Sequence, residues 1–357
     1  MVRRSAALFL LLGLSPLAAA LAGTGTDAVP FMKVDTGARA AGMAGAFSAV
    51  ADDASAVFHN PAGLVLLERS EAMFSHSEWL EGIRNECVSY AHVTGNDWAF
   101  GAGASMLFSG SMAKYDRSGA SAGSFTENEG FASAAAANRL GENMAAGFAV
   151  KGIYQKLDQE SAAAYAADAG LLYHDYSWRF AVGVENIGSK MKLYREEFDL
   201  PAGYKAAAAW RAYDPLWVTA QVTQRPSSGF SAALGAEYGF LVRERDTVYA
   251  RAGYLAGPGA DAGSGFSLGL GLGNSKFKLD YAFTPFGDLG NAHRVSFSLR
   301  FGEDRDTLRS RDAGSGPYKK RYKAKGETWK EQKRELEKQD RRKTEERKRR
   351  ENPYFTW

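Results

Sequence analysis

Between residues 71 and 301, apolar and polar residues alternate with a period of two. In residues 293–301, for example, Val295, Phe297, Leu299 and Phe301 alternate with Arg294, Ser296, Ser298 and Arg300. Such alternation predicts β-strands with one apolar and one polar face. A soluble sandwich would also alternate. Here the apolar face is rich in aromatic residues and the polar face carries small and charged ones, which favours a lipid-facing band around a polar lumen.

Turn-forming residues divide this region into segments. We predict 14 strands, at residues 71–79, 86–94, 98–108, 131–140, 143–156, 163–175, 178–187, 203–212, 216–224, 229–240, 247–256, 264–273, 276–284 and 291–301. An even number is typical of bacterial single-chain barrels. Short connections at 141–142, 176–177 and 274–275 suit hairpins. The longer connections around 109–130, 189–202 and 257–263 are expected on the extracellular side.

Five of the seven tryptophans fall near predicted strand ends. They are Trp79, Trp98, Trp178, Trp210 and Trp217. Membrane barrels place such amphipathic rings at the level of the lipid headgroups. We therefore predict that these five form a membrane girdle, the alternative being ordinary core packing.

The beginning of the chain and its composition fit an exported barrel. Residues 1–22 have the charged start, short apolar run and small-x-small end of a secretory signal. No later run reaches the ~18 consecutive apolar residues of a membrane-spanning helix. The 39 Gly, 16 Tyr and 21 Phe favour turns and aromatic strands. The single cysteine, Cys87, excludes a disulfide framework and a cysteine-based metal cluster, and its alternating surroundings predict a strand position.

Residues 36–64 differ from the strands because they consist mostly of Gly and Ala. The turn signal Asn60-Pro61-Ala62-Gly63 closes the stretch. A segment with so little side-chain volume can thread a confined space such as the inside of a barrel. The alternative is a helix–turn linker at the start of the domain.

The chain changes character after Phe301. Residues 303–357 hold 19 Lys and Arg against 12 Asp and Glu, a net charge of +7, whereas the whole chain carries +3. We expect a flexible linker at 302–316 and a charged helix at 327–351, with no heptad seam for a coiled coil. The tail is either a solvated, partly disordered extension or a basic arm that contacts anionic lipid, a cell-wall polymer or another envelope protein. Export makes a nucleic-acid partner implausible.

Two stretches carry a resemblance to a known family. One is GARAAGM at 37–43 followed by ADDASA at 51–56 and NPAGL at 60–64, and the other is LDYAF at 279–283 followed by LGNAHRVSF at 289–297. In this order, behind a signal peptide, they resemble the PorV/PorQ proteins and their wider FadL-like relatives. The resemblance implies an all-β, 14-stranded outer-membrane barrel whose N-terminal segment enters the lumen as a hatch.

On this basis we divide the chain into a signal peptide (1–22), a hatch or plug (23–69), a transmembrane barrel (70–302) and a periplasmic tail (303–357). The hatch residues singled out are Arg39, Asp52, Asp53, Asn60, Pro61 and Gly63. Asp52 and Asp53 are expected to meet lumen-facing cations on the polar faces of the strands. The candidates are Lys151, Arg251, Lys278, Arg294 and Arg300.

Three functions remain open. The first is passage of hydrophobic small molecules across the outer membrane, with Phe47, Phe58 and Leu64 as candidate ligand-lining residues unless they only pack against the wall. The second is a structural adaptor in secretion or surface attachment, using the tail. The third, an enzyme acting on lipid, is disfavoured because no histidine has the spacing of a catalytic triad. We expect no cofactor and no metal, and we expect outer-membrane lipid around the barrel.

Overall fold

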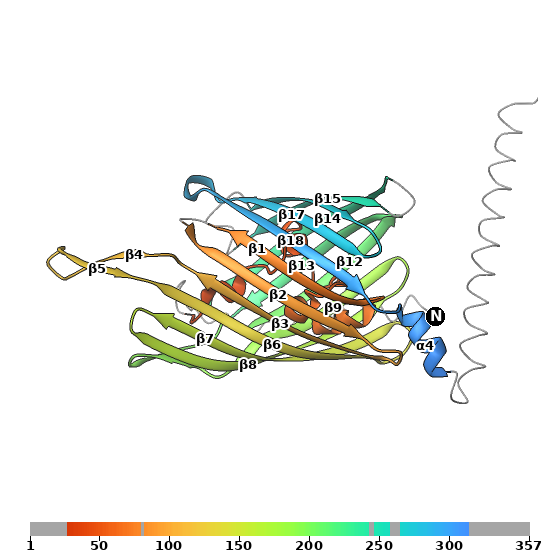
Figure 1. The fold of residues 1–357 in the computed structure, drawn as a ribbon, viewed down its shortest axis with the longest axis horizontal. Coiled ribbons are helices and arrows are strands. Elements are labelled where there is room, and N and C mark those ends of the chain that lie inside the picture. The colour runs from red at the N-terminus through yellow and green to blue at the C-terminus, as the bar shows by residue number, and fades with distance from the viewer. Residues whose placement is uncertain (1–26, 80–81, 243–245, 258–264, 314–357) are drawn as a thin grey trace, which may run out of the picture.

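The alternating segments pair in sequence order and close into one antiparallel barrel of 14 strands (Figure 1). The computed structural model describes residues 27–79, 82–242, 246–257 and 265–313. The predicted signal peptide, the connection at 258–263 and the tail after residue 313 lie outside them. The barrel strands are β1 (Ser70–Glu78), β2 (Arg84–Val93), β3 (Trp98–Phe108), β6 (Glu127–Arg139), β7 (Met144–Leu157), β8 (Glu160–His174), β9 (Trp178–Gly188), β12 (Gly203–Tyr213), β13 (Leu216–Arg225), β14 (Gly229–Leu241), β15 (Thr247–Ala256), β16 (Phe266–Gly273), β17 (Phe277–Pro285) and β18 (Asn291–Phe301).

The barrel closes where its first and last strands meet. Ser70 of β1 lies opposite Phe301 of β18, and Glu78 lies opposite His293. The predicted all-β, 14-stranded antiparallel barrel is thus confirmed. Two strands begin at least three residues earlier than predicted, β6 at Glu127 and β8 at Glu160. Both extensions carry polar residues, so the apolar alternation that marks the rest of each strand does not reach them.

The two ends of the barrel differ. We call the end where β1 begins and β18 finishes the terminus end, and the opposite one the loop end. At the loop end the connections carry two extra hairpins, β4 (Met112–Tyr115) with β5 (Ser121–Phe125) and β10 (Met191–Leu193) with β11 (Glu196–Phe198). The β4–β5 hairpin projects well beyond the barrel in Figure 1. The connections at the terminus end are short, as the sequence predicted.

The two faces of each strand follow the sequence pattern. On β18 the side chains of Val295, Phe297 and Leu299 are exposed on the outer face, whereas Ser296 and Ser298 are buried on the inner face. The same division runs around the barrel, so that large apolar side chains form its outer surface. An apolar exterior of this extent is expected of a surface that meets lipid.

Residues 27–67, which we call the lumen segment, run lengthwise through the barrel. The segment begins at the loop end, where the Ala28 N–H donates to the carbonyl oxygen of Asp199 (2.9 Å). It reaches the terminus end at Leu67, three residues before β1. Its regular elements are all short: η2 (Pro30–Lys33), α2 (Ala38–Ala41), α3 (Ala56–His59) and η3 (Pro61–Leu66). In the described residues no helix is long and apolar enough to cross a membrane.

A helix, α4 (Arg305–Ala313), follows β18 at the terminus end (Figure 1). The prediction of a flexible linker here was therefore wrong. Asp304 accepts a hydrogen bond from the Thr307 N–H (2.8 Å), which caps the first turn of the helix. The Arg305 N–H donates to the Glu68 carbonyl (2.7 Å), and Arg309 pairs with Asp97 (2.8 Å). These contacts hold α4 against the barrel.

Candidate functional site

The lumen segment fits closely because the barrel wall presents glycines to it. A Cβ atom added at Gly147 of β7 would lie 2.2 Å from the Ala62 nitrogen, and one at Gly253 of β15 would lie 2.3 Å from the Met43 carbonyl carbon. Both distances are far shorter than any van der Waals contact. The two glycines lie on opposite sides of the segment's path, so the backbone of the segment rests directly on the wall.

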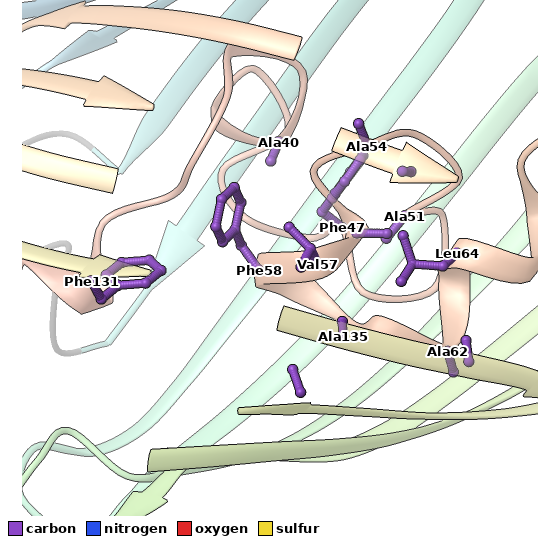
Figure 2. Packing of buried hydrophobic residues seen from close by; sticks show 14 of the residues in the cluster. Ala40, Phe47, Ala51, Ala54, Val57, Phe58, Ala62, Leu64, Phe131 and Ala135 are labelled. Carbon is purple, nitrogen blue, oxygen red and sulfur yellow. The ribbon is translucent and has the colours of Figure 1, made fainter. Parts of the chain in front are cut away.

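Apolar side chains fill the space that remains around the segment (Figure 2). Phe47 and Leu64 are fully buried. Phe47 meets the ring of His59 edge-on at 5.1 Å between centroids. Phe58 meets Phe131 of β6 edge-on at 5.6 Å. Aromatic pairs in this geometry stabilise beyond their buried area.

Asn60 and Gly63 fix the turn that sends the segment toward β1. The Asn60 side chain accepts from the Ala62 N–H (3.1 Å) and donates to the Ser48 carbonyl (3.0 Å). Pro61 occupies the first position of η3, where a missing N–H costs nothing. A Cβ at Gly63 would lie 2.0 Å from the Ala51 carbonyl oxygen. Each residue of this motif therefore has a definite steric or hydrogen-bonding role.

The centre of the site is an ionic cluster around Arg39. Its guanidinium group pairs with Asp52 (2.6 Å) and Asp53 (2.9 Å) of the lumen segment and with Glu237 of β14 (2.8 Å). Asp52 also pairs with Arg179 of β9 (2.9 Å). One segment is thus tied to two well-separated strands of the wall. We call these five residues the clamp.

The clamp continues into the wall through Glu237. Arg251 of β15 donates to Glu237 (2.6 Å) and pairs with Asp280 of β17 (2.9 Å), which lies 3.6 Å from the Lys278 ammonium. Burial alone would raise the pKa of Asp52, but the guanidinium groups of Arg39 and Arg179 outweigh it and hold that pKa well below its usual value. The carboxylate is therefore charged at neutral pH.

All five predicted lumen-facing cations lie on the inner face. Their partners differ from those expected, because Asp52 and Asp53 pair with Arg39 and Arg179 instead. Lys151 pairs with Asp168 (2.6 Å), and Arg300 pairs with Glu71 (2.8 Å), which in turn accepts from the Ala54 N–H. Sequence reasoning missed Arg179 and Glu237. Both lie on the inward positions of predicted strands, which was the available signal.

Three of the five tryptophans predicted to form a membrane girdle occupy outward positions. Trp98, Trp178 and Trp210 are exposed on the outer face, and all three lie at the terminus end. Trp79 and Trp217 were assigned wrongly. Trp79 lines the lumen at the loop end, and the Trp217 ring lies under the guanidinium group of Arg179 (4.6 Å), inside the barrel.

A cavity of about 430 Å³ lies at the loop end, between the beginning of the lumen segment and the wall. This volume is typical of small-molecule sites. Its aromatic lining consists of Phe58, Trp79, Phe131 and Phe286. Its charged lining consists of Lys33, Asp35, Lys151, Glu185, Lys205, Arg225 and Arg294. Of the three predicted ligand-lining residues, Phe58 alone is on its wall, because Phe47 and Leu64 are enclosed by packing.

A β-bulge shapes one side of this cavity. Between β8 and β9 the register shifts, so that Glu185 and Asn186 together oppose Asp168. The Asn186 N–H donates to the Asp168 carboxylate (2.8 Å), and its side chain accepts from Lys151 (2.8 Å). The bulge therefore adds a buried polar group beside the cavity without leaving these backbone groups unpaired.

His59 forms part of the cavity floor. Its Nε2 lies 2.9 Å from the Thr36 carbonyl oxygen. Burial lowers the pKa of His59, so the imidazole is neutral at neutral pH. Among the described residues no group of three or more His, Cys, Asp or Glu side chains could hold a metal ion.

Comparison with known families gives a partial match. A model of an uncharacterised protein family (UPF0164) matches residues 22–164. Two UPF0164 proteins of Treponema pallidum (strain Nichols) are 40% and 37% identical to the chain over 73 residues, 20% of its length. The matched stretch is 18% and 22% of the length of these relatives.

Solved structures match over most of the chain at low identity. The Pseudomonas putida toluene transporter TodX has a TM-score of 0.55 at 12% identity, covering 74% of this chain and 98% of its own. The CymD monoaromatic hydrocarbon channel has the same score and identity, covering 76% and 98%. A Pseudomonas aeruginosa FadL homologue reaches 0.52 at 12% identity, covering 75% and 98%.

The chain therefore has the fold of FadL-like barrels. The expected resemblance is confirmed at this level. The closer assignment to PorV/PorQ stays a prediction.

Proposed function

We propose that this protein is an outer-membrane barrel that passes small hydrophobic molecules, with the lumen segment acting as its plug. The observation that carries the proposal is the division of the lumen. The part toward the terminus end is filled by the clamp and by packed apolar side chains, while the loop end keeps a partly aromatic cavity of about 430 Å³. Barrels that share this fold include channels for monoaromatic hydrocarbons.

In this scheme a molecule enters at the loop end and rests in the cavity above the plug. Phe58 and Phe131 supply apolar surface on one side, and Trp79 with Phe286 (6.1 Å between ring centroids) supplies it on another. Onward passage requires the lumen segment to move or the wall to open. The clamp sets the free energy that such a movement costs, since a buried carboxylate without its guanidinium partner is strongly unfavourable.

A cavity-filling variant tests the passage. Ser231 of β14 lines the cavity, so Ser231→Phe is expected to occupy it while leaving the clamp intact. Cells that produce this variant in a heterologous outer membrane should take up the hydrophobic dye N-phenylnaphthylamine more slowly than cells with equal amounts of the wild type. Ser161→Phe, at an exposed position of β8, is the matched control. Equal uptake by all three proteins would contradict the proposal.

An adaptor role in secretion or surface attachment is the second candidate. The observation that favours it is the docking of α4 at the terminus end, through Arg309 to Asp97 and through Leu308 to the apolar core. This docking would hold the start of the basic tail at the periplasmic mouth of an outer-membrane barrel. Cross-linking in whole cells, with and without residues 314–357, tests it. A specific envelope protein or cell-wall product that disappears with the tail would support the adaptor.

A further inference from the structure

One cation on the cavity wall differs from all the others. Lys33 pairs with Asp27 (2.5 Å) and Lys151 with Asp168 (2.6 Å), while Lys205 and Arg225 share Glu185. Arg294 of β18 makes no ion pair with any of the described residues. It is only 7% exposed, and its Nε has no hydrogen-bond partner there.

Such a state is costly in a folded protein. A buried guanidinium group normally finds a carboxylate, because its desolvation is otherwise uncompensated. Asp35 lines the same cavity and attracts Arg294 through space, yet no ion pair or hydrogen bond joins the two side chains. The unused hydrogen-bond donors of Arg294 therefore lie beside the cavity and not against packed side chains.

The charge balance of the cavity points the same way. Five cations line it, and with their partners included four carboxylates accompany them. The cations are Lys33, Lys151, Lys205, Arg225 and Arg294, and the carboxylates are Asp27, Asp35, Asp168 and Glu185. His59 is neutral and does not change the count. One positive charge is left over in the cavity as a whole, because two cations share Glu185, and this net charge suits a ligand with a single negative charge.

The apolar part of the lining indicates what accompanies that charge. Phe58 with Phe131 and Trp79 with Phe286 form two edge-on ring pairs on the cavity wall. Flat apolar rings pack well against such pairs. A guanidinium group, for its part, binds a carboxylate through two parallel hydrogen bonds. The cavity thus offers surfaces for an aromatic ring together with one site for a carboxylate.

We propose that the cavity binds an aromatic monocarboxylate, with the carboxylate on Arg294 and the ring against the aromatic wall. This inference deepens the proposed function, because it names the substrate class of the same cavity. It also separates this chain from the hydrocarbon channels that share its fold, since toluene carries no charge to satisfy a guanidinium group.

The test compares two probes of nearly equal shape that differ in charge, benzoate and benzamide. Binding of each radiolabelled probe to the full chain in lipid nanodiscs is measured by equilibrium dialysis, with empty nanodiscs subtracted. The wild type should bind benzoate about tenfold or more tightly than benzamide, as expected for a hydrogen-bonded charge pair. Equal affinities would overturn the inference.

Variants locate the effect. Arg294→Gln should abolish the preference for benzoate, so that the two probes bind about equally, and heat-modifiable gel migration like that of the wild type shows that the variant is folded. Arg294→Lys should keep part of the preference. Arg211→Gln is the matched control, because Arg211 also faces the lumen but lies at the terminus end, with its guanidinium group over the Trp217 ring. A preference that survives Arg294→Gln would overturn the assignment.

The two proposals fail separately. One outcome is a benzoate preference that depends on Arg294 in a protein whose dye uptake is unaffected by Ser231→Phe. It would support the carboxylate site and contradict the proposed passage of hydrophobic molecules. The opposite outcome is dye uptake that Ser231→Phe slows in a protein without any benzoate preference. It would support the proposed passage and contradict the carboxylate site.

Discussion

The terminus end and the loop end of the lumen treat buried charge in opposite ways. Toward the terminus end, Arg39 meets three carboxylates, and glycines let the segment lie directly on the wall. At the loop end, Arg294 is equally enclosed but has no ion pair with the described residues, and a cavity lies in front of it. Buried charge is thus satisfied internally in one region and left for a ligand in the other.

This difference separates a region suited to holding the lumen segment from a region suited to binding a ligand. A region in which the buried charges form ion pairs with one another is suited to hold the lumen segment in place. A region that leaves one cation unmatched has hydrogen-bonding capacity for a molecule from outside. Variants of the holding region are expected to have the largest effects.

Removing the central cation should have the largest effect. Arg39→Gln leaves Asp52, Asp53 and Glu237 close together without the guanidinium group that they share. Breaking a buried ion pair from one side costs about 3–5 kcal/mol. We expect the lumen segment to detach and the barrel to conduct ions in a planar bilayer, where the wild type remains closed.

Arg309→Gln is the control for Arg39→Gln. Arg309 pairs with Asp97, whose side chain is half-exposed at the surface. Exposed pairs contribute about 0–1 kcal/mol, so this variant should stay closed. An Arg39→Gln barrel that is as silent as the wild type would show that the clamp does not hold the plug.

The next largest effect concerns the contact between segment and wall. Gly147→Ala adds a methyl group 2.2 Å from the Ala62 nitrogen, whereas a Cβ at Gly152 on the same strand meets nothing within 4 Å. Overpacking of this kind costs about 1–3 kcal/mol. Heat-modifiable gel migration should show a lowered unfolding temperature for Gly147→Ala and an unchanged unfolding temperature for Gly152→Ala. Similar unfolding temperatures for the two variants would mean that the lumen segment can shift away from the wall at little cost in stability.

A smaller loss is expected at the turn before β1. Asn60→Ala removes the acceptor for the Ala62 N–H and the donor to the Ser48 carbonyl. Loss of such a cap costs about 1 kcal/mol. Asn96→Ala, which removes the acceptor for the Trp98 N–H in an exposed turn, should cost less. Chemical unfolding of both variants in the same detergent compares them, and a larger loss for Asn96→Ala would contradict the role given to Asn60.

The barrel was predictable from sequence because alternation is a local signal. Each strand shows its own inner and outer face, and the number of strands follows from counting. The clamp was not predictable. That Asp52 meets Arg179 and that Arg39 meets Glu237 depends on how far the segment enters the lumen and on the registers of β9 and β14. No pattern within a single stretch of sequence indicates how deeply the lumen segment is inserted.

The two misassigned tryptophans show a different error. Their nearness to strand ends was read correctly, but their side of the strand was not used. Trp217 has the same parity as the buried Thr219, and Trp79 has the same parity as the buried Ser77. Since side chains alternate strictly along a strand, both rings had to point inward. Position along the strand gives depth, and parity gives the face.

This distinction leads to the smallest effect, which is spectroscopic. Lipids brominated near the headgroup quench only indole rings that touch them. Trp178→Phe should therefore reduce the quenchable part of the emission, because Trp178 is exposed on the outer face and stacks on Trp210 (5.9 Å). Trp217→Phe should reduce only the part that resists quenching, since that ring lies inside the barrel. Trp178 lies outside the barrel, and Trp217→Phe keeps an aromatic ring under Arg179, so neither change should open the barrel. If Trp217→Phe removed as much quenchable emission as Trp178→Phe, the inner and outer faces of β13 would be reversed, and the segment could not pack as described.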